Sequence, residues 1–505
     1  MSTKPLPNSE QNTYMADLKL TALLINTSLQ KCVKSVLLIA VALSATLSLD
    51  AAEHIVTPDT DLKPVLKQVK SGDSVVLQNG TWIDADLTFD ELPGTSKAPI
   101  HIRAQTPGKV ILTGATQFRF SGSYITVSGL LVRDPTGVSD VIQFRTHSER
   151  HAQHCRVTDC SIEESPDSHE KKESRWISIY GTNNRVDHCY TAGKKNRGTT
   201  LVVWVTEQPG NHRIDHNHFG PRPKLGSNGG ETLRIGTSDV SEFDSKTTVE
   251  NNYFHACDGE AEIVSNKSCD NVYRHNTFDS CSGALTLRHG HRCVVDGNVF
   301  FGRKQSGTGG VRIIGESHTV TNNYFEGLRG DSERAALCLM NGVPNSPLHE
   351  YAPVRNAKVA HNTFIDCKVS VEIGVGVGKK QSAVPDKCEF AHNVFVPGKW
   401  ELFRVHADPT GLSWVDNRLQ PRTRKDTPFR EFRETKLSMQ RTDDGLLRPS
   451  GSDSFKAALA SMVSQDIDGF PRQSSVICGC DDPTTKHKTL ANASNTGPSW
   501  RKQTP

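Results

Sequence analysis

A four-residue pattern, in which phenylalanine follows an asparagine after one intervening residue, recurs through the middle of the chain. Its seven copies are His216-Asn217-His218-Phe219, Asn251-Asn252-Tyr253-Phe254, His275-Asn276-Thr277-Phe278, Gly297-Asn298-Val299-Phe300, Asn322-Asn323-Tyr324-Phe325, His361-Asn362-Thr363-Phe364 and His392-Asn393-Val394-Phe395. Consecutive asparagines lie 35, 24, 22, 25, 39 and 31 residues apart, which is a basic period of 22 to 25 residues with insertions. Self-similarity at this period indicates a solenoid of stacked coils.

Two solenoids have periods of this size, the leucine-rich repeat and the parallel β-helix. Leucine is not periodic here whereas Asn-x-Phe is, and only 35% of the residues are hydrophobic, which favours short strands and many turns. We therefore predict an all-β fold, a right-handed parallel β-helix. The repeated asparagines should then bond to the backbone and to their copies above and below, while the phenylalanines stack in the core.

Weaker repeats precede the marked ones and extend the expected solenoid toward the N-terminus. Short alternating runs closed by Gly, Asn or Asp are found at 100–103, 110–112, 125–130, 155–162 and 184–189. Residues 60–70 have helical apolar spacing and predict a helix that caps the open end of the solenoid. We expect the β-helix to occupy 53–440 and a C-terminal extension, 441–505, to pack on it.

The first 52 residues resemble a secretory signal with a polar segment before it. Lys31 and Lys34 precede an apolar run of 12 residues at 36–47, and small residues follow at Ala51 and Ala52. Such a run is too short to span a bilayer, which needs about 20 apolar residues, so no stable membrane insertion of the mature chain is expected. The alternative is a buried strand or helix. A signal predicts a periplasmic or secreted protein.

Thirteen cysteines are present, and twelve remain if the signal carries Cys32 away. Cys257, Cys281 and Cys367 each stand five residues after a repeated asparagine, which predicts a column of small buried side chains in stacked coils. Disulfides within the pairs 155/160 and 478/480 stay open at this stage. No C-x-x-C pair exists, so a zinc ribbon is not supported.

Charged residues gather in two neighbouring coils. Glu260 and Glu262 are separated by Ala261, and on a strand this spacing would turn both carboxylates to one face with the alanine inward. Lys267 follows, and Arg288 lies 21 residues beyond it, close to one coil of the repeat. The net charge of +3 is small for 505 residues, so a general nucleic-acid binder is unexpected. Stacking predicts a local patch of two carboxylates and two cations.

Four strings in this region resemble polysaccharide lyase family 6, the chondroitinase B and alginate lyase group. They are Asn228-Gly229-Gly230-Glu231-Thr232-Leu233-Arg234-Ile235-Gly236, Glu260-Ala261-Glu262-Ile263-Val264-Ser265-Asn266-Lys267-Ser268, Leu285-Thr286-Leu287-Arg288-His289-Gly290 and Gly309-Gly310-Val311-Arg312-Ile313-Ile314-Gly315. The similarity runs from about residue 53 to 500. Some family members carry a second β-helix domain, for which this chain is too short.

The resemblance implies cleavage of a uronic-acid polysaccharide by β-elimination. That reaction removes the C5 proton, expels the 4-O-linked sugar and requires the neighbouring carboxylate to be neutralised, a role that suits calcium. By similarity the calcium ligands are Asn228, Glu260 and Glu262. Lys267 falls at the general base, which must be neutral to act, a state that nearby positive charge favours. Arg288 falls at the position that protonates or stabilises the leaving oxygen; arginine is a poor proton donor, so water as the proton source stays open.

His289 and Arg312 match substrate-contacting positions in the resembling family, and three more residues are candidates for the same role. The expected substrate-binding residues are His289, Arg312, Glu231, Arg234 and Arg334, of which the arginines would follow the carboxylates or sulfates of an acidic polymer. Alginate is the favoured substrate and dermatan sulfate the alternative. A non-catalytic polysaccharide-binding β-helix and a C5-epimerase are the remaining hypotheses.

Overall fold

The computed structural model describes residues 51–421, 432–450, 456, 463–472, 477–481 and 487–503. The chain divides at Ala51/Ala52 into two compact units, and the second, 52–505, contains nearly all of the described residues. The expected signal before Ala51 lies outside them. No helix in the described ranges is long and apolar enough to cross a bilayer.

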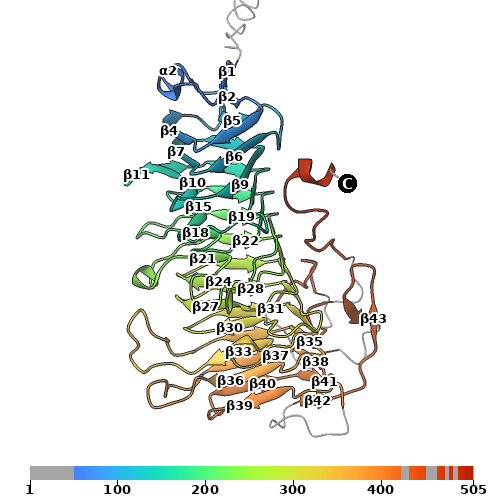
Figure 1. The fold of residues 1–505 in the computed structure, drawn as a ribbon. Coiled ribbons are helices and arrows are strands. Elements are labelled where there is room, and N and C mark those ends of the chain that lie inside the picture. The colour runs from blue at the N-terminus through green and yellow to red at the C-terminus, as the bar shows by residue number, and fades with distance from the viewer. Residues whose placement is uncertain are drawn as a thin grey trace, which may run out of the picture. The chain divides into compact units, whose positions relative to one another are not determined.

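The described residues between 53 and 434 form a parallel β-helix with three sheets along its length (Figure 1). Apart from the two ends, each coil contributes one strand to each sheet, in the order I, III, II. Sheet I contains β1 (Glu53–Val56), β2 (Ser74–Leu77), β5 (Ile100–Ala104), β8 (Ile125–Ser128), β13 (Arg156–Thr158), β16 (Arg185–Asp187), β19 (Arg213–Asp215), β22 (Thr248–Glu250), β25 (Val272–Arg274), β28 (Val294–Asp296), β31 (Thr319–Thr321), β34 (Lys358–Ala360), β37 (Cys388–Ala391) and β40 (Leu412–Val415).

Sheet II forms the face that later carries the candidate site. It contains β4 (Asp86–Pro93), β7 (Gln117–Ser123), β10 (Asp140–Gln143), β15 (Arg175–Ile179), β18 (Leu201–Val203), β21 (Leu233–Ile235), β24 (Glu262–Lys267), β27 (Ala284–His289), β30 (Val311–Ile313), β33 (Leu337–Met340), β36 (Val371–Val375) and β39 (Phe403–Val405), with the hairpin β11 (Arg145–His147) and β12 (Arg150–Gln153) at its edge.

Sheet III contains β3 (Gly80–Ile83), β6 (Val110–Gly114), β9 (Leu130–Pro135), β14 (Ser161–Glu163), β17 (Tyr190–Ala192), β20 (His218–Phe219), β23 (Tyr253–His255), β26 (Thr277–Asp279), β29 (Val299–Phe301), β32 (Tyr324–Glu326), β35 (Thr363–Ile365), β38 (Val394–Val396), β41 (Asn417–Leu419) and β42 (Phe432–Glu434). The predicted β-helix is therefore confirmed, including the weakly marked early coils.

The repeated asparagines form a continuous ladder at the corner between sheets I and III. Asn298 accepts hydrogen bonds from the backbone N–H and the side-chain amide of Asn276, at 3.0 and 2.9 Å, and donates to Asn323 at 3.0 Å. The same contacts run from Asn217 to Asn417, one coil beyond the seven copies in the sequence pattern. Every ladder amide is buried. Coil stacking is thus specified by side chains as well as by the strand backbones.

The residue before each ladder asparagine makes the corner itself. It adopts positive φ in every copy, at 53° for His216, 63° for Gly297 and 57° for His392. A single left-handed residue between two strands turns the chain sharply, and Gly, Asn, Asp and His tolerate that conformation best. This explains why only those four types precede the repeated asparagine.

The phenylalanines of the repeat stack inside sheet III as predicted. Ring centroids from Phe219 to Phe395 follow one another at 4.5 to 4.9 Å with nearly parallel planes. The predicted cysteine column is confirmed for Cys257 and Cys281, where the backbone N–H of Cys257 meets the sulfur of Cys281 at 3.5 Å; Cys367 is buried as predicted, but two coils without a cysteine at this position separate it from Cys281. All cysteines in the described residues are buried and free, including those at 155, 160, 478 and 480.

A short helix stands at the N-terminal end of the solenoid. α2 (Leu62–Leu66) begins after Asp61, whose carboxylate accepts the N–H of Lys63 at 3.0 Å, and its apolar side chains pack on the core. The helix is shorter than the predicted 60–70 because the chain turns after Leu66 and buries Val69. The remaining helical turns are the 3-10 helices η1 (Ser238–Val240), η2 (Ser332–Arg334) and η3 (Ser499–Gln503).

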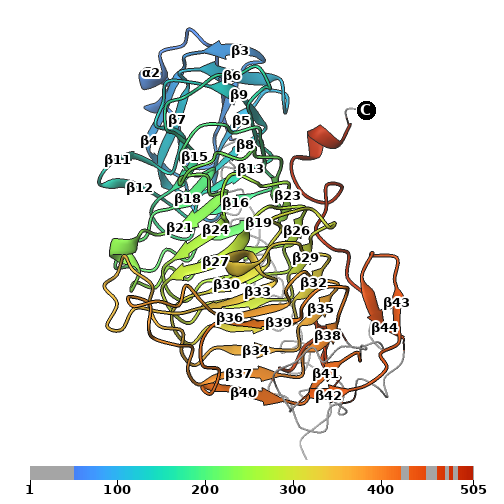
Figure 2. The ribbon, with the colours of Figure 1, turned by 60° about the horizontal axis from the view of Figure 1, so that its bottom comes forward.

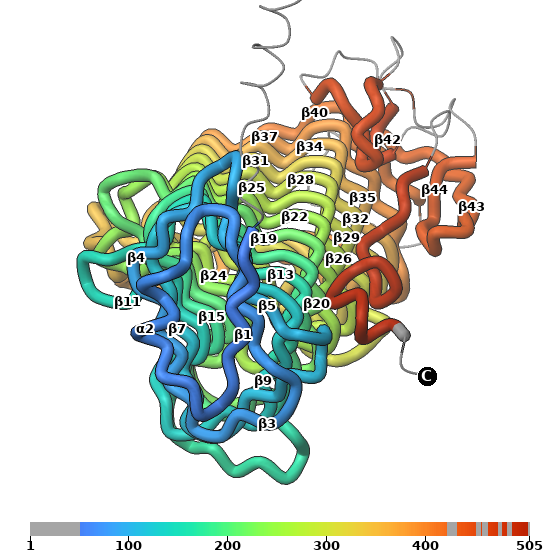
Figure 3. The backbone as a smooth tube through the Cα atoms, turned by 90° about the horizontal axis from the view of Figure 1, so that it is seen from above, coloured from blue at the N-terminus to red at the C-terminus, as the bar shows by residue number. Residues whose placement is uncertain are grey.

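The C-terminal segment leaves the solenoid after β42 and runs back along sheet III (Figures 1 and 2). It begins with the antiparallel hairpin of β43 (Met439–Arg441) and β44 (Leu447–Pro449), where the Leu447 N–H donates to the Tyr324 hydroxyl at 2.9 Å. Near the end, the Trp500 indole donates to the Asp159 carbonyl at 2.8 Å. Seen along the axis, the segment lies on the outer side of sheet III, away from sheet II (Figure 3).

We predict that Asn298→Ala strongly destabilises the fold. The change leaves both donors of Asn276 without their acceptor, and a buried donor without a partner costs about 1–3 kcal/mol. The free energy of unfolding, measured by chemical denaturation, should fall by about 3 kcal/mol. Asn79→Ala, whose contacts are exposed, is the matched control and should change stability by less than about 1 kcal/mol. Equal midpoints for the two variants would contradict the ladder.

Candidate functional site

A groove of about 910 Å³ lies over sheet II and receives nine of the ten residues singled out in the sequence. These are Asn228, Glu231, Arg234, Glu260, Glu262, Lys267, Arg288, Arg312 and Arg334. They come from five successive coils, so the groove crosses the strands along the solenoid axis. Coil stacking therefore brings together residues up to about a hundred positions apart in the sequence.

The two carboxylates of the Glu-Ala-Glu string share the groove, but not by strand alternation. β24 begins only at Glu262, and Glu260 sits in the bend before it. The prediction that Ala261 turns inward is wrong, because the residue lies outside the strand and lines the groove with its neighbours. Glu260 is held instead by the backbone N–H groups of Gly229 and Gly230, at 2.9 and 3.2 Å.

Glycines allow this close approach between the two loops. A Cβ on Gly230 would lie 2.5 Å from the Gly259 carbonyl oxygen, and one on Gly259 would lie 2.1 Å from that of Gly230. Gly229 also has φ +96°, which a larger residue would adopt only with strain. The Gly229-Gly230 pair is thus needed to bring the loop of Asn228 against the bend of Glu260.

A third carboxylate, that of Glu231, lines the groove near Glu260 and Glu262. Its side chain is 6% exposed, and its Oε2 atom has no hydrogen-bond partner among the described residues. Burial, and next the Glu231 and Glu262 carboxylates, raise the pKa of Glu260 to about 7. Three crowded carboxylates with an unsatisfied oxygen are a donor set that a hard cation such as calcium fits. The sequence indicated Glu231 only as a substrate contact.

A β-bulge sets the two candidate catalytic cations side by side. The register between β24 and β27 pairs Asn266 with Leu287 but Lys267 with His289, so Arg288 is the extra residue. A bulge redirects the side chains next to it, and bulges are frequent beside active sites. Both Lys267 and Arg288 consequently line the groove.

Two of the arginines that line the groove lie close to Glu262. Arg312 approaches the Glu262 carboxylate at 3.5 Å and Arg288 at 3.9 Å. Both guanidinium groups also contact Tyr351, which projects from the loop 341–357 between β33 and β34. Burial lowers the pKa of Arg288, with the Arg312 charge acting in the same direction.

His289 is the one predicted residue that does not line the groove. This residue is 3% exposed, with Nε2 3.2 Å from the Ser238 hydroxyl and Nδ1 3.4 Å from Arg288 Nη1. Burial, with the charges of Arg288 and Lys267, lowers the pKa of His289 to about 3, so the ring is neutral. Contact between His289 and substrate stays a prediction.

Arg222 is a buried residue that sequence reasoning missed. It is 3% exposed and donates to the carbonyl oxygens of Glu231 at 2.6 Å and Gly198 at 2.9 Å, and it contacts that of Gly229 at 3.3 Å. The Arg222 guanidinium thereby holds together the loops of two adjacent coils, on the buried side of the groove carboxylates. Nothing in the repeat marked this arginine, because its partners are backbone atoms.

A second group of possible metal ligands lies in the C-terminal segment. Asp468, Asp481 and His487 come within 4.8 Å of one another. Arg448, itself 2% exposed, already occupies this cluster, at 3.0 Å from Asp468 and 2.7 Å from Asp481. The guanidinium supplies the positive charge there, so the groove is the better candidate for a cation.

The Chondroitinase B family profile matches residues 56–397. No curated protein sequence matches significantly. The PL6 family alginate lyase AlyGC is 38% identical with a TM-score of 0.79, over 89% of this chain but 58% of the AlyGC chain. This chain therefore spans less than two thirds of the length of AlyGC.

Two further structures are similar over most of their own length. A mannuronic acid specific family 6 lyase from human gut microbiota is 34% identical, with a TM-score of 0.70 over 77% of this chain and 92% of its own. A PL6 alginate lyase solved with a trisaccharide shares the fold at 22% identity and a TM-score of 0.70. With the family profile matching well over half of its residues, this chain belongs to polysaccharide lyase family 6.

Proposed function

We propose that this protein is a calcium-dependent polysaccharide lyase that cleaves a uronic-acid polymer by β-elimination. The observation that carries the proposal is the shared groove, in which Lys267 and Arg288 lie with the Glu231, Glu260 and Glu262 carboxylates. Alginate is the favoured substrate, since two solved relatives above 30% identity are an alginate lyase and a mannuronate-specific lyase. Dermatan sulfate is the alternative, favoured by the match to the Chondroitinase B family.

The cation would be held by Glu260, Glu262 and Glu231, with Asn228 at the rim of the groove. When bound, calcium supplies positive charge that neutralises the uronate carboxylate and so acidifies the C5 proton. Lys267, in its neutral form, removes that proton. The flow of electrons forms the C4–C5 double bond and releases the O4-linked sugar, whose oxygen faces the positive charge of Arg288.

Cationic side chains continue beyond the reacting centre and would orient the polymer. Arg234 and Arg334 line the groove on either side of Lys267, and Arg197 and Lys224 extend the positive edge. Guanidinium groups match carboxylates and sulfates in geometry and charge, so this edge fits an acidic polysaccharide and would hold neighbouring sugar units. We also propose export to the periplasm or medium, where such polymers occur.

The first prediction concerns substrate. Purified protein with calcium should release unsaturated uronate from polymannuronate or polyguluronate, followed by the absorbance of the new double bond. A rise on dermatan sulfate alone would select the alternative substrate. No rise on any of the three polymers, with binding retained, would instead indicate a non-catalytic polysaccharide-binding protein.

The second prediction concerns calcium and has a readout apart from activity. Calcium should raise the melting temperature of the wild-type protein, because a ligand at 100 times its dissociation constant stabilises the folded state by about 2.7 kcal/mol. Glu262→Gln should remove this shift, while Glu316→Gln, a half-buried control whose one ion pair among the described residues is with Arg355, should keep it. A melting temperature that is insensitive to calcium in the wild type would refute the cation site.

The third prediction concerns the base. Lys267→Ala should lower kcat by about 10²–10⁴-fold, the usual contribution of a positioned base, without a change in melting temperature. Lys358→Ala, an exposed lysine on sheet I, serves as the matched control. If Lys267→Ala retained more than a tenth of the wild-type turnover, another group would have to remove the C5 proton.

A further inference from the structure

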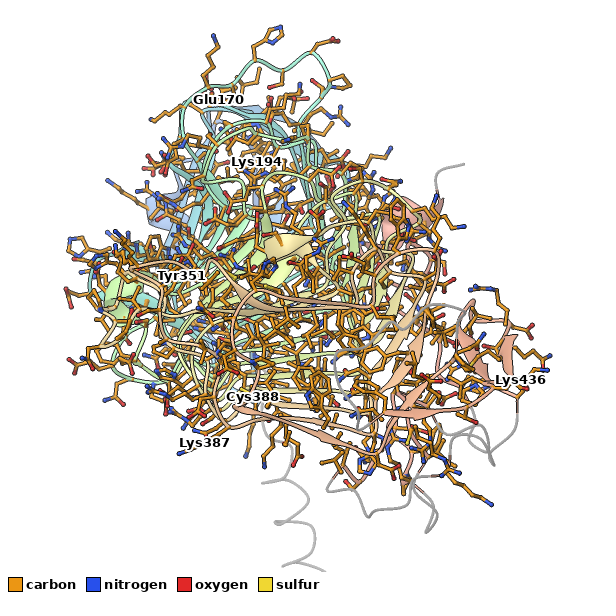
Figure 4. The ribbon with its side chains drawn as sticks, turned by 90° about the horizontal axis from the view of Figure 1, so that it is seen from below. Glu170, Lys194, Tyr351, Lys387, Cys388 and Lys436 are labelled. Atoms are coloured by element: carbon orange, nitrogen blue, oxygen red, sulfur yellow. The ribbon has the colours of Figure 1, made fainter. Side chains whose placement is uncertain are left out.

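The loop 341–357 places a tyrosine hydroxyl in the groove beside both arginines. The Arg288 guanidinium carbon lies 4.1 Å from the centre of the Tyr351 ring, and Arg312 Nη2 donates to the Tyr351 hydroxyl at 3.3 Å. Tyr351, which Figure 4 labels, lines the same groove as Lys267. It is 63 positions from Arg288 in the chain, and no repeat or motif marks it.

The backbone holds this tyrosine firmly. The Tyr351 carbonyl accepts the N–H of Val343 at 2.7 Å, and the next carbonyl, of Ala352, accepts that of Gly315 at 3.3 Å. Arg288 also donates to the Glu350 carbonyl at 3.0 Å. Tyr351 packs with a small apolar cluster built on Ile314 and Met340. The ring is therefore fixed relative to Arg288 before any substrate arrives.

The hydroxyl proton of Tyr351 is available for transfer. Arg312 donates to the oxygen, and no described residue accepts the hydroxyl's own proton, so that proton can be donated to a bound substrate. A guanidinium is a poor proton donor, whereas a phenol can give up its proton when positive charge stabilises the phenolate. Arg288 and Arg312 supply that charge from two sides.

We propose that Tyr351 is the proton donor to the leaving group, an assignment that rests on the lyase function proposed above. Lys267 takes the C5 proton, the C–H electrons form the C4–C5 double bond, and the C4–O4 bond breaks as O4 takes the Tyr351 proton. The product is an unsaturated uronate end and a free 4-hydroxyl. Proton exchange with water then returns one proton to Tyr351 and removes one from Lys267. Arg288 stabilises the charge that develops and keeps its own proton throughout.

The test separates proton removal from departure of the leaving sugar. Tyr351→Phe keeps the ring on Arg288 and deletes only the hydroxyl. In D₂O with the preferred polymer and calcium, this variant should lose at least 100-fold in elimination while KM changes by less than threefold. It should still exchange the C5 proton of intact polymer for deuterium, because Lys267 is unaffected, and Lys267→Ala should do neither.

Tyr253→Phe on sheet III is the matched control and should behave as the wild type in both measurements. Elimination by Tyr351→Phe within threefold of wild type would overturn the proposal and leave Arg288 or water as the donor. Equal loss of exchange and elimination, with an unchanged melting temperature, would also overturn it, since the tyrosine would then serve proton removal. A wild-type protein that eliminates none of the polymers would instead refute the lyase function itself.

Discussion

Register between coils is the constraint on which this structure depends. Each ladder asparagine binds its copies above and below and satisfies buried backbone groups of both neighbouring coils. A slip of one coil by a single residue would leave these amides without partners in a dry interior, where each lost bond is expensive. Strand pairing alone fixes register weakly, because every peptide group is alike. The ladder and the stacked phenylalanines make one register far better than its alternatives.

A fixed register is what converts separate stretches of sequence into a site. The carboxylates of the Glu260 bend, Lys267 and Arg288 lie on adjacent coils, and the bulge opposite Lys267 brings Arg288 onto the groove face. The result is a groove that places unlike charges close together without pairing them fully. The Glu231 and Glu260 carboxylates lie close together, and burial, followed by the charge of Glu231, raises the pKa of Glu260. Such repulsion between carboxylates is expected at a site that binds a cation.

Much of the fold and of the site could be predicted from the sequence, because each coil of a solenoid contacts only the coils next to it in the chain. The Asn-x-Phe period predicts the fold and the burial of the cysteines, and the motif strings contain eight of the nine predicted residues that line the groove, all but Arg334. Failures occur where the period breaks. Ala261 was assigned to a strand that starts one residue later, and the N-terminal helix is shorter than its apolar spacing suggested. Tyr351 and Arg222 act from irregular segments through contacts that no spacing rule encodes.

The central claim is that a uronate unit binds with its carboxylate at the Glu260–Glu262 corner and its C5 proton toward position 267. A crystal structure of Lys267→Ala with calcium and a uronate tetrasaccharide tests this most directly. The account predicts a cation held by both glutamates and by the sugar carboxylate, with C5 facing the space left by the lysine. An oligosaccharide bound on another face, or with its carboxylate turned away from these glutamates, would contradict it.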